Sequence, residues 1–337
     1  MVRLNYSITQ KTIVGILAVA IVGIGATLGW SLTQPAGNSG EPLLITIKPG
    51  TPTRTIAAEL ENQKLIRNAL VFRAAAKLQG LENSLQAGEY AISPDMSIRK
   101  MLLMMSQGQT AYQQFTIPEG YTVDQVAELL AEKKLANAEK FKAAAKNFAP
   151  FSYMTSHPDS KYRVEGFIFP DTYRVTRGVS EEELLTMMVK QFDTKLTPDL
   201  RQRAIDKGLS LREVVIMASL VEKEAKLSEE RPVIAGVFAN RVKQAMPLQS
   251  CATIQYILGY PKPELTIHDT QIPSPYNTYQ IMGLPPGPIA NPGNAAIRAV
   301  LFADNTDYLY FVADKQGKHH FSKTYEEHLA AIDQVQI

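Results

Sequence analysis

The chain has 337 residues, of which 45% are hydrophobic and 20% are charged, and its formal net charge at pH 7 is +2. This composition is typical of globular protein, and the near balance of charge gives no basic field of the kind that binds nucleic acid, so we set that class aside. A single cysteine, Cys251, excludes an internal disulfide and a cysteine metal cage, and the five histidines show no HExxH-type spacing, so we expect no metal site and no cofactor.

The N-terminal segment predicts a membrane anchor. Residues 13–32, IVGILAVAIVGIGATLGWSL, form an uncharged run of twenty residues, about 30 Å as a helix and enough to cross a bilayer. We assign 1–11 to a cytoplasmic tail and 12–32 to an uncleaved single-pass anchor, with a buried core helix as the alternative. Because Arg3 and Lys11 precede the run and the next basic residue is Lys48, the rest of the chain is expected on the outer, periplasmic side of the inner membrane.

An internal repeat follows a short linker, TQPAGNSGEP, at 33–42. ITIKPGTPTRTIAAELENQKLI from Ile45 aligns with FTIPEGYTVDQVAELLAEKKLA from Phe115 at an offset of 70 residues, and FRAAAK matches FKAAAK further on. Each copy predicts a strand, a glycine turn and an amphipathic helix that starts at Thr53 or Thr122.

These units resemble LysM-type modules, which bind glycans containing N-acetylglucosamine. The first module is placed at 43–112, and the second copy, at about 115–147, belongs to a region that runs from 113 to 337. Contact with a wall polysaccharide and a purely structural role both remain open for the two copies.

The pattern of predicted elements changes after about residue 150. VEGFIFPDTYRV, at 164–175, predicts a short strand pair broken at Pro170. Helices are expected over 181–196 and 211–226, then a long segment rich in turn formers, then a helix capped by Asn291 and a hairpin of 308–312 with 319–321. The fold class predicted for the whole chain is α+β: a transmembrane helix, LysM-like βα modules and a mixed α+β catalytic domain.

The stretch ASLVEKEA, at 218–225, places two glutamates at the end of an apolar helix. Glu222 falls on the apolar side, where loss of hydration favours the protonated form that a general acid needs, whereas Glu224 lies about 200° further round and is expected to stay solvated and ionised. An ordinary surface pair of Glu222 with Lys226 is the alternative.

The turn-rich segment supplies neutral hydrogen-bonding and aromatic groups that suit a sugar surface. Some of these groups are equally compatible with shaping turns, and Asp171 is either a second carboxylate for Glu222 or a turn residue. The predicted substrate-binding residues are Gln249, Ser250, Thr253, Tyr276, Asn277 and Tyr279.

Six ordered motifs, ASLVEKEA, EGFIFPDTY, LQSCATIQY, SPYNTY, GLPPGPIANPG and HHFSKTYEEH, together resemble the membrane-anchored endolytic murein transglycosylases, the MltG/YceG-like family. The resemblance implies that Glu222, the first glutamate of VEKE, is the catalytic acid. It also implies cleavage of peptidoglycan glycan strands at the membrane, near cell-wall synthases. Many relatives carry Asp-Pro after LQS, where this chain has Cys251 and Ala252. The alternatives are a hydrolytic muramidase using Glu222 and Asp171, and a non-enzymatic wall-binding scaffold.

Overall fold

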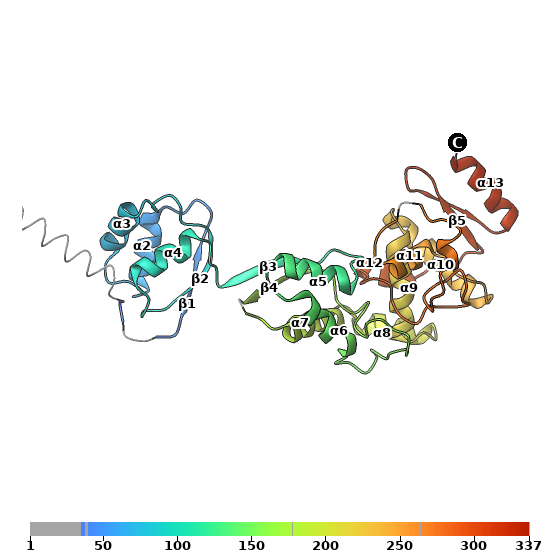
Figure 1. The fold of residues 1–337 in the computed structure, drawn as a ribbon, viewed down its shortest axis with the longest axis horizontal. Coiled ribbons are helices and arrows are strands. Elements are labelled where there is room, and N and C mark those ends of the chain that lie inside the picture. Colours follow the sequence, from blue (N-terminus) through green and yellow to red (C-terminus); the bar gives the residue numbers. More distant parts are fainter. Residues whose placement is uncertain (1–34, 38–39, 177, 263, 337) are drawn as a thin grey trace, which may run out of the picture. The chain divides into compact units, whose positions relative to one another are not determined.

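The computed structural model describes residues 35–336 except 38, 39, 177 and 263. The predicted anchor at 12–32 lies outside the described residues. Within the described part, none of the helices is long and apolar enough to cross a membrane. Contacts divide the chain into two units, the first ending at Gln113 and including Val175 and Thr176, and the second made of Gln114–Arg174 and the residues from Gly178 onward (Figure 1).

The first unit places three helices around a two-stranded antiparallel sheet in which Leu43 faces Ile92. One face of each helix is buried against this sheet, and the core includes the fully buried side chains of Leu60, Phe72 and Tyr90. Its elements are β1 (Leu43–Ile47), α2 (Thr53–Asn62), α3 (Ala69–Leu78), β2 (Gly88–Ile92) and α4 (Ile98–Ser106).

The second copy of the repeat has the same backbone plan. Its helices start 70 and 69 residues after those of the first copy, and Gly50 and Gly120 both adopt the left-handed conformation, with φ of 76° and 75°. A glycine accommodates this φ without steric cost, which explains the turn before each first helix. The elements are β3 (Tyr112–Thr116), α5 (Val123–Glu132), α6 (Ala138–Asn147) and β4 (Thr172–Thr176), and β3 pairs with β4. Each copy therefore has the order βααβ.

The strand pair expected within 164–175 is wrong in part. Only Thr172–Thr176 is a strand, and its partner is β3 rather than the preceding residues. Gly166 turns the chain with a φ of 86°, and a side chain there would collide with Pro288 and Val215. The apolar residues of this stretch are therefore buried in a turn instead of a ladder.

Helix α9 (Leu211–Glu224) lies at the centre of the second unit, in contact with α8, α10, α11 and α12. A capping box of Ser210 and Glu213 starts it, and every side chain from Val214 to Val221 is buried. The remaining elements are α7 (Glu181–Lys195), α8 (Pro198–Asp206), α10 (Arg231–Lys243), α11 (Cys251–Leu258), α12 (Asn294–Leu301), β5 (Tyr310–Ala313), β6 (His319–Ser322) and α13 (Tyr325–Gln336), with 3₁₀ turns at Ser228–Glu230 and Asp269–Gln271.

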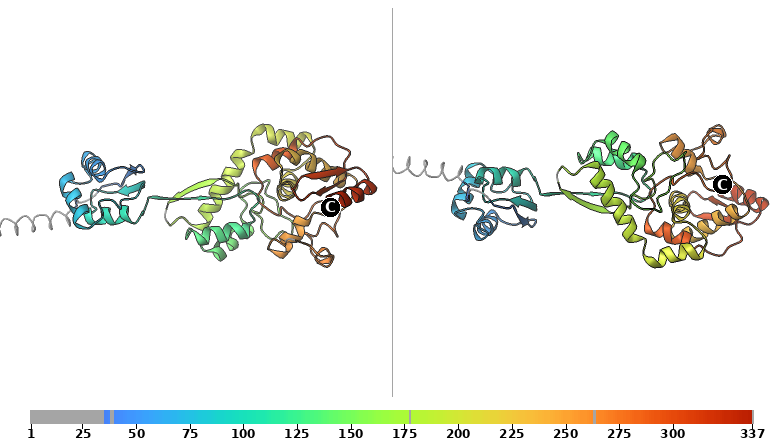
Figure 2. Two further views of the ribbon diagram at one scale, coloured as in Figure 1. Left: turned by 90° about the horizontal axis from the view of Figure 1, so that it is seen from above. Right: turned by 90° about the horizontal axis from the view of Figure 1, so that it is seen from below.

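This mixture of helices with small sheets confirms the α+β fold class. The predicted C-terminal hairpin is confirmed as well, because β5 and β6 pair antiparallel with Phe311 opposite Phe321. Figure 2 shows this hairpin and α13, in red, lying together at one end of the second unit.

Asn291 is not the cap of α12, as the sequence had predicted. The N-cap is Gly293, and the buried Asn291 instead accepts a hydrogen bond from the Ile168 amide (2.9 Å) and donates to the Tyr121 carbonyl (2.8 Å). Its side chain thus joins three separate segments of the second unit, a role that local sequence patterns do not reveal.

Candidate active site

Glu224 is the last residue of α9, because Ala225 adopts an extended conformation. The hydroxyl of Ser250 donates to Glu224 Oε1, and the backbone amide of Ala252 also donates to this carboxyl group. Burial raises the pKa of Glu224, while these hydrogen bonds and the nearby His319 act in the opposite direction. The result is a carboxyl group that holds its proton to higher pH than an exposed glutamate does.

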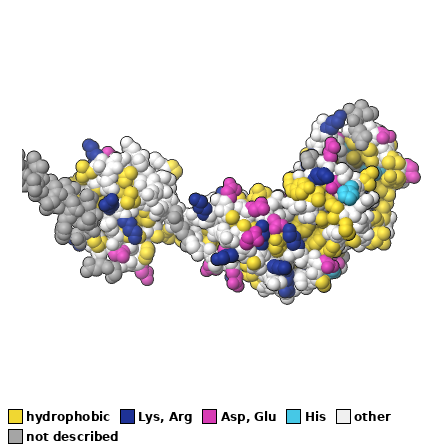
Figure 3. All heavy atoms as spheres, in the orientation of Figure 1, with side chains coloured by type: hydrophobic (Ala, Val, Ile, Leu, Met, Phe, Trp, Pro, Cys, Tyr) yellow, Lys and Arg dark blue, Asp and Glu magenta, His cyan; other side chains and the backbone are white. Residues whose placement is uncertain are grey.

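Glu224 lines a pocket of about 380 Å³. Gln249, Cys251 and Tyr279 contribute polar groups to one wall of the pocket, and the β5–β6 hairpin and α13 contribute another wall. On the face shown in Figure 3, hydrophobic side chains gather with histidine over the C-terminal part of the second unit. The pocket therefore combines a buried acid with neutral hydrogen-bonding and apolar surfaces, as a carbohydrate site requires.

Gln249 holds Ser250 in place through an unusual backbone conformation. Its φ is 53°, in the left-handed region that non-glycine residues rarely adopt. Two hydrogen bonds fix this turn: the Gln249 amide donates to the Thr278 carbonyl (3.0 Å), and the Ser250 amide donates to Thr278 Oγ1 (3.0 Å). Strain of this kind persists only where the surroundings hold it, and it is frequent at active sites.

Three of the predicted binding residues are used inside the fold. Asn277 is fully buried; its Nδ2 donates to the carbonyls of Thr270 (3.0 Å) and Ile272 (2.8 Å). Thr253 is also fully buried, and its hydroxyl donates to the Ser250 carbonyl (2.7 Å). Tyr276 packs on Tyr256, with ring centroids 5.0 Å apart. These side chains shape the loop, whereas Gln249, Ser250 and Tyr279 lie at the pocket or on Glu224.

Cys251 and Tyr279 form a neutral pair in the pocket. Cys251 is exposed at the pocket and its thiol lies 3.0 Å from the Tyr279 hydroxyl, and partial desolvation raises the pKa of both groups. The hydrogen bond with Tyr279 acts in the opposite direction on the pKa of Cys251, and ionisation of Glu224 would raise that pKa further. This pair therefore adds no negative charge to the pocket near neutral pH.

Glu222 has different surroundings. Its side chain is only 6% exposed; Oε1 accepts a hydrogen bond from Arg231 Nη2 (3.2 Å), and Oε2 accepts one from the Gly293 amide (2.9 Å). The guanidinium and the amide both stabilise a charged carboxylate. Glu119 lies nearby, and burial, followed by the charge of Glu222, raises the pKa of Glu119.

The predicted contrast between the two glutamates is therefore wrong for Glu224, which is half-buried, is hydrogen-bonded to Ser250 and has a raised pKa. The direction of a side chain on a helix follows from its position, but what covers that side chain does not. Here Ser250 and the first turn of α11 cover the side of α9 that the sequence pattern marks as polar. The polar side of the helix end is in this way buried by a distant part of the chain.

Asp171 does not join either glutamate. Its Oδ2 accepts a hydrogen bond from Gln191 Nε2 (2.6 Å) on α7, its Oδ1 accepts one from the Thr172 amide (2.7 Å), and it does not line the pocket of Glu224. This is the turn role that the sequence left open for it.

Several residues that line the pocket were not predicted, among them Arg241 and His319. Arg241 donates from Nε to the Leu309 carbonyl (2.6 Å) and from Nη1 to the Leu248 carbonyl (3.0 Å), so it ties the two walls together. His319 Nδ1 lies 2.7 Å from Glu230 Oε2. His319 is part of the HHFSKTYEEH motif, which could have marked it, but Arg241 is an ordinary basic residue of a helix in the sequence.

Comparison with known proteins adds three findings. The model of the YceG-like family matches residues 45–334. The "Endolytic murein transglycosylase" of Streptococcus pneumoniae serotype 2 (strain D39) is 33% identical over 344 residues, covering 92% of this chain and 62% of that protein. The protein of the same description from Bacillus subtilis (strain 168) is 32% identical over 322 residues, covering 91% and 89%.

Among solved structures, the crystal structure of a yceG-like protein from Listeria monocytogenes is similar to this fold. Its TM-score is 0.63 at 34% sequence identity, and the match covers 86% of this chain and 98% of that one. This chain spans about 62% of the length of the streptococcal relative.

Proposed function

This chain belongs to the YceG-like family, and from that premise we propose that it is an endolytic murein transglycosylase. The reaction is cleavage of the β-1,4 bond between N-acetylmuramic acid and N-acetylglucosamine within a glycan strand, without water, to leave a 1,6-anhydro end. The names of the streptococcal and Bacillus relatives support this activity. Neither a hydrolytic muramidase nor a non-enzymatic scaffold is favoured.

The observation that carries the proposal is the buried carboxyl group of Glu224 in its pocket. Burial raises its pKa, which suits a group that must give up a proton near neutral pH. We assign the acid to Glu224 rather than to Glu222, because Glu222 already engages Arg231 and the Gly293 amide with its two oxygens. Glu222 is the alternative acid, and a comparison of substitutions at the two glutamates decides between them.

Glu224 serves twice in the proposed mechanism. It first protonates the glycosidic oxygen, so that the bond from that oxygen to C1 of the muramyl sugar breaks. The resulting carboxylate then removes the proton from the 6-hydroxyl of the same sugar as its oxygen attacks C1. Because the nucleophile belongs to the substrate, the reaction needs no second carboxylate, unlike most glycosidases. Gln249 and Tyr279 offer neutral hydrogen bonds to the sugar at the pocket wall.

A matched pair of substitutions tests the acid. Glu224→Gln keeps the size of the side chain and removes the acid, so release of anhydromuramyl-ended strands should fall by roughly 10²–10⁴-fold. Glu222→Gln keeps its place beside Arg231 and should have a much smaller effect on this rate. Thermal melts establish that both variants are folded before the rates are compared.

The reverse result, a dead Glu222→Gln and an active Glu224→Gln, would assign the acid to Glu222. Product mass tests the reaction class in the same samples, because hydrolysis adds one water to each cleaved strand and transglycosylation adds none. Intact strands after incubation with the folded wild-type chain would favour a binding protein instead.

The proposal extends to the location of the chain. We place it as a single-pass protein of the inner membrane, anchored by 12–32, with the catalytic region outside the cytoplasm and near cell-wall synthases, where it limits the length of nascent strands. The support is the uncharged twenty-residue run and the basic residues before it. Protease added to spheroplasts should digest the region after residue 42, and complete protection would contradict this topology.

The two βααβ copies are proposed to be LysM-like modules that contact the glycan. Their support is the shared order of elements and the common left-handed glycine before the first helix. In this proposal the second copy lies within the catalytic region and the first copy is a separate binding module.

A further inference from the structure

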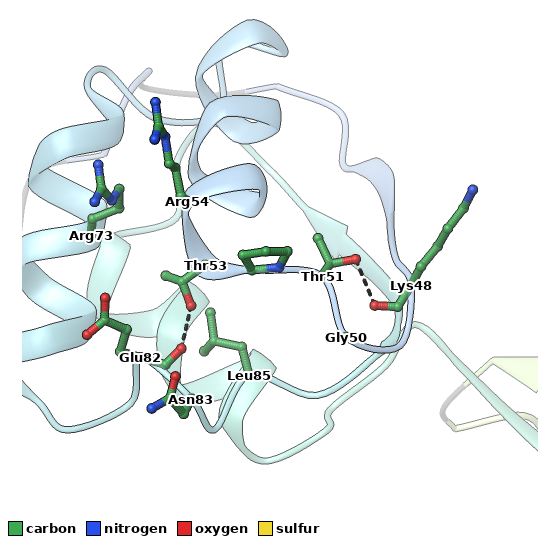
Figure 4. A pocket seen from close by; sticks show the side chains of 10 residues that line it. Lys48, Gly50, Thr51, Thr53, Arg54, Arg73, Glu82, Asn83 and Leu85 are labelled. Atoms are coloured by element: carbon green, nitrogen blue, oxygen red, sulfur yellow. Dashed lines mark hydrogen bonds between the residues drawn. The ribbon is translucent and has the colours of Figure 1, made fainter.

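The first unit has a pocket of about 550 Å³ beside the turn that joins β1 to α2 (Figure 4). Arg54 on α2 and Arg73 on α3 extend along one side of this pocket, and Lys48 lies at the opposite side. Among the residues that the structure describes, neither arginine has a hydrogen bond or an ion pair. Two cations on adjacent helices repel each other, and with Lys48 they outnumber Glu82, the acid that lines the same pocket, so the pocket keeps a net positive charge.

The second copy of the repeat provides an internal comparison. At the 70-residue offset, Arg54 corresponds to Asp124, and Arg73 corresponds to Lys142 in the matched FRAAAK and FKAAAK segments. Asp124 accepts hydrogen bonds from Lys161 Nζ (2.5 Å) and Tyr162 Oη (2.7 Å).

Lys142 in the same copy pairs with Glu139, at 3.2 Å. In the second copy, therefore, these two positions are neutralised by groups of the protein itself. In the first copy both positions are cationic, and the positive charges of the two arginines are available to bind a ligand.

The rest of the pocket fits a single carboxylate. The lining has three cations against one acid, Glu82, and the side chain of Asn83 can donate and accept. Thr51 and Thr53 already donate to the carbonyls of Lys48 and Glu82, which fixes the turn at the pocket floor (Figure 4). A guanidinium group binds a carboxylate through two parallel hydrogen bonds. Because Glu82 repels negative charge, a singly charged group is favoured over a doubly charged phosphate.

We propose that this pocket binds a carboxylate of the peptide stems that peptidoglycan strands carry, through Arg54 and Arg73. The choice of stem peptides as the source rests on the proposed function, since they are the carboxylate-bearing groups of that substrate. The first unit would then distinguish strands with stems from bare glycan.

Binding of soluble fragments by the full chain tests the proposal. The probe is the disaccharide N-acetylglucosaminyl-N-acetylmuramic acid with its peptide stem, which lacks the bond that the proposed reaction cleaves. Two comparison ligands are the same disaccharide without a stem and with the stem carboxylates converted to amides. The wild type should bind the stem-bearing fragment at least about tenfold more tightly than either comparison ligand at about 0.15 M salt.

The double variant Arg54→Gln/Arg73→Gln should lose this preference. Arg99→Gln/Lys100→Gln removes the same charge from exposed positions of α4 that do not line the pocket, and it should keep the preference. Equal Kd values for the wild type and the Arg54/Arg73 variant, or equal losses in both double variants, would overturn the proposal.

Vesicles containing phosphatidylglycerol are a further ligand in this binding test. If they bind through the arginine pair while the stem-bearing fragment does not, the ligand is a phosphate group and the stem proposal is wrong. None of these measurements depends on turnover, so a failure here is distinct from a failure of the proposed reaction.

Discussion

Glu165 has a buried carboxyl group outside the Glu224 pocket, only 1% exposed. It accepts hydrogen bonds from the Val123 amide (3.0 Å), from Tyr256 Oη (3.1 Å) and from Asn291 Nδ2 (3.2 Å), so it joins α5, α11 and the segment before α12. Burial raises its pKa to about 8, and the hydrogen bonds from Val123 and Tyr256 only partly oppose this. In the folded chain this group is therefore neutral at neutral pH.

This shift predicts a pH dependence of stability. The pKa of Glu165 is about 8 in the fold and 4.5 in its ordinary state, so the folded chain holds the proton more tightly than the unfolded chain. Its contribution to the free energy of unfolding is complete below about pH 4.5 and is lost as the pH rises through 8, with a slope of about 1 kcal/mol per pH unit between.

Denaturant unfolding at pH 5.5 and at pH 8.5 measures this effect for the wild type and Glu165→Gln. The variant keeps the shape of the side chain without a titrating group, so it should lose most of the wild type's decrease in stability. The pH dependence of stability of Glu165→Gln is compared with that of Glu224→Gln, because burial also raises the pKa of Glu224. The same pH slope in the wild type and in Glu165→Gln would show that Glu165 is charged in the fold.

At the scale of elements, α10 holds the segment that leads into β5. Asn240 Nδ2 donates to the carbonyls of Thr306 (2.7 Å) and Tyr308 (3.0 Å), and a Cβ at Gly236 would lie 2.7 Å from the Asp304 carbonyl oxygen. This close approach places the hairpin, and with it one wall of the Glu224 pocket.

Gly236→Ala should therefore destabilise the second unit by about 1–3 kcal/mol, because overpacking against backbone outweighs the gain in helix propensity of about 1 kcal/mol. Activity should fall as well, since the displaced hairpin lines the pocket. Thermal unfolding and strand cleavage are measured together. The control is Ala239→Gly at an exposed position of α10, which should lose helix propensity only and keep full activity. A Gly236→Ala variant more stable than the wild type would mean that segment 304–306 moves freely.

At the scale of the whole molecule, the first unit has a core of its own. Its buried cluster is drawn only from residues between Ile45 and Met105, and Phe72, a member of this cluster, is fully buried. A unit with a separate core is expected to unfold separately from the rest of the chain.

Phe72→Ala should destabilise the first unit by about 3–5 kcal/mol, through lost burial and the cavity left behind. Hydrogen exchange should show faster exchange in α2, α3 and β2 and unchanged protection in α9 and α12. Cleavage of short strands should then be unaffected at temperatures where the second unit is folded. Loss of protection in both units together would contradict their independence.

Local patterns predicted much of this fold. The sequence pattern placed α7 and α9 within two residues of their observed ends, and the repeat predicted two copies whose helices recur at nearly one spacing. These features depend on neighbours in the sequence, which is why the sequence alone determines them. The ordered motifs likewise sufficed for the family. The anchor at 12–32 and the glycan-binding role of the repeats stay predictions.

The tertiary structure alone decided the surroundings of the candidate site. Helical geometry placed Glu224 on the polar side of α9, but Ser250 and the start of α11, more than twenty residues away in the chain, bury it. Asn277 is likewise a residue of a type that suits sugar binding, yet its side-chain amide donates hydrogen bonds to two carbonyls of its own loop. Burial and hydrogen-bond satisfaction depend on which distant segments pack against a residue, and the periodicity of a single helix or strand carries no information about them.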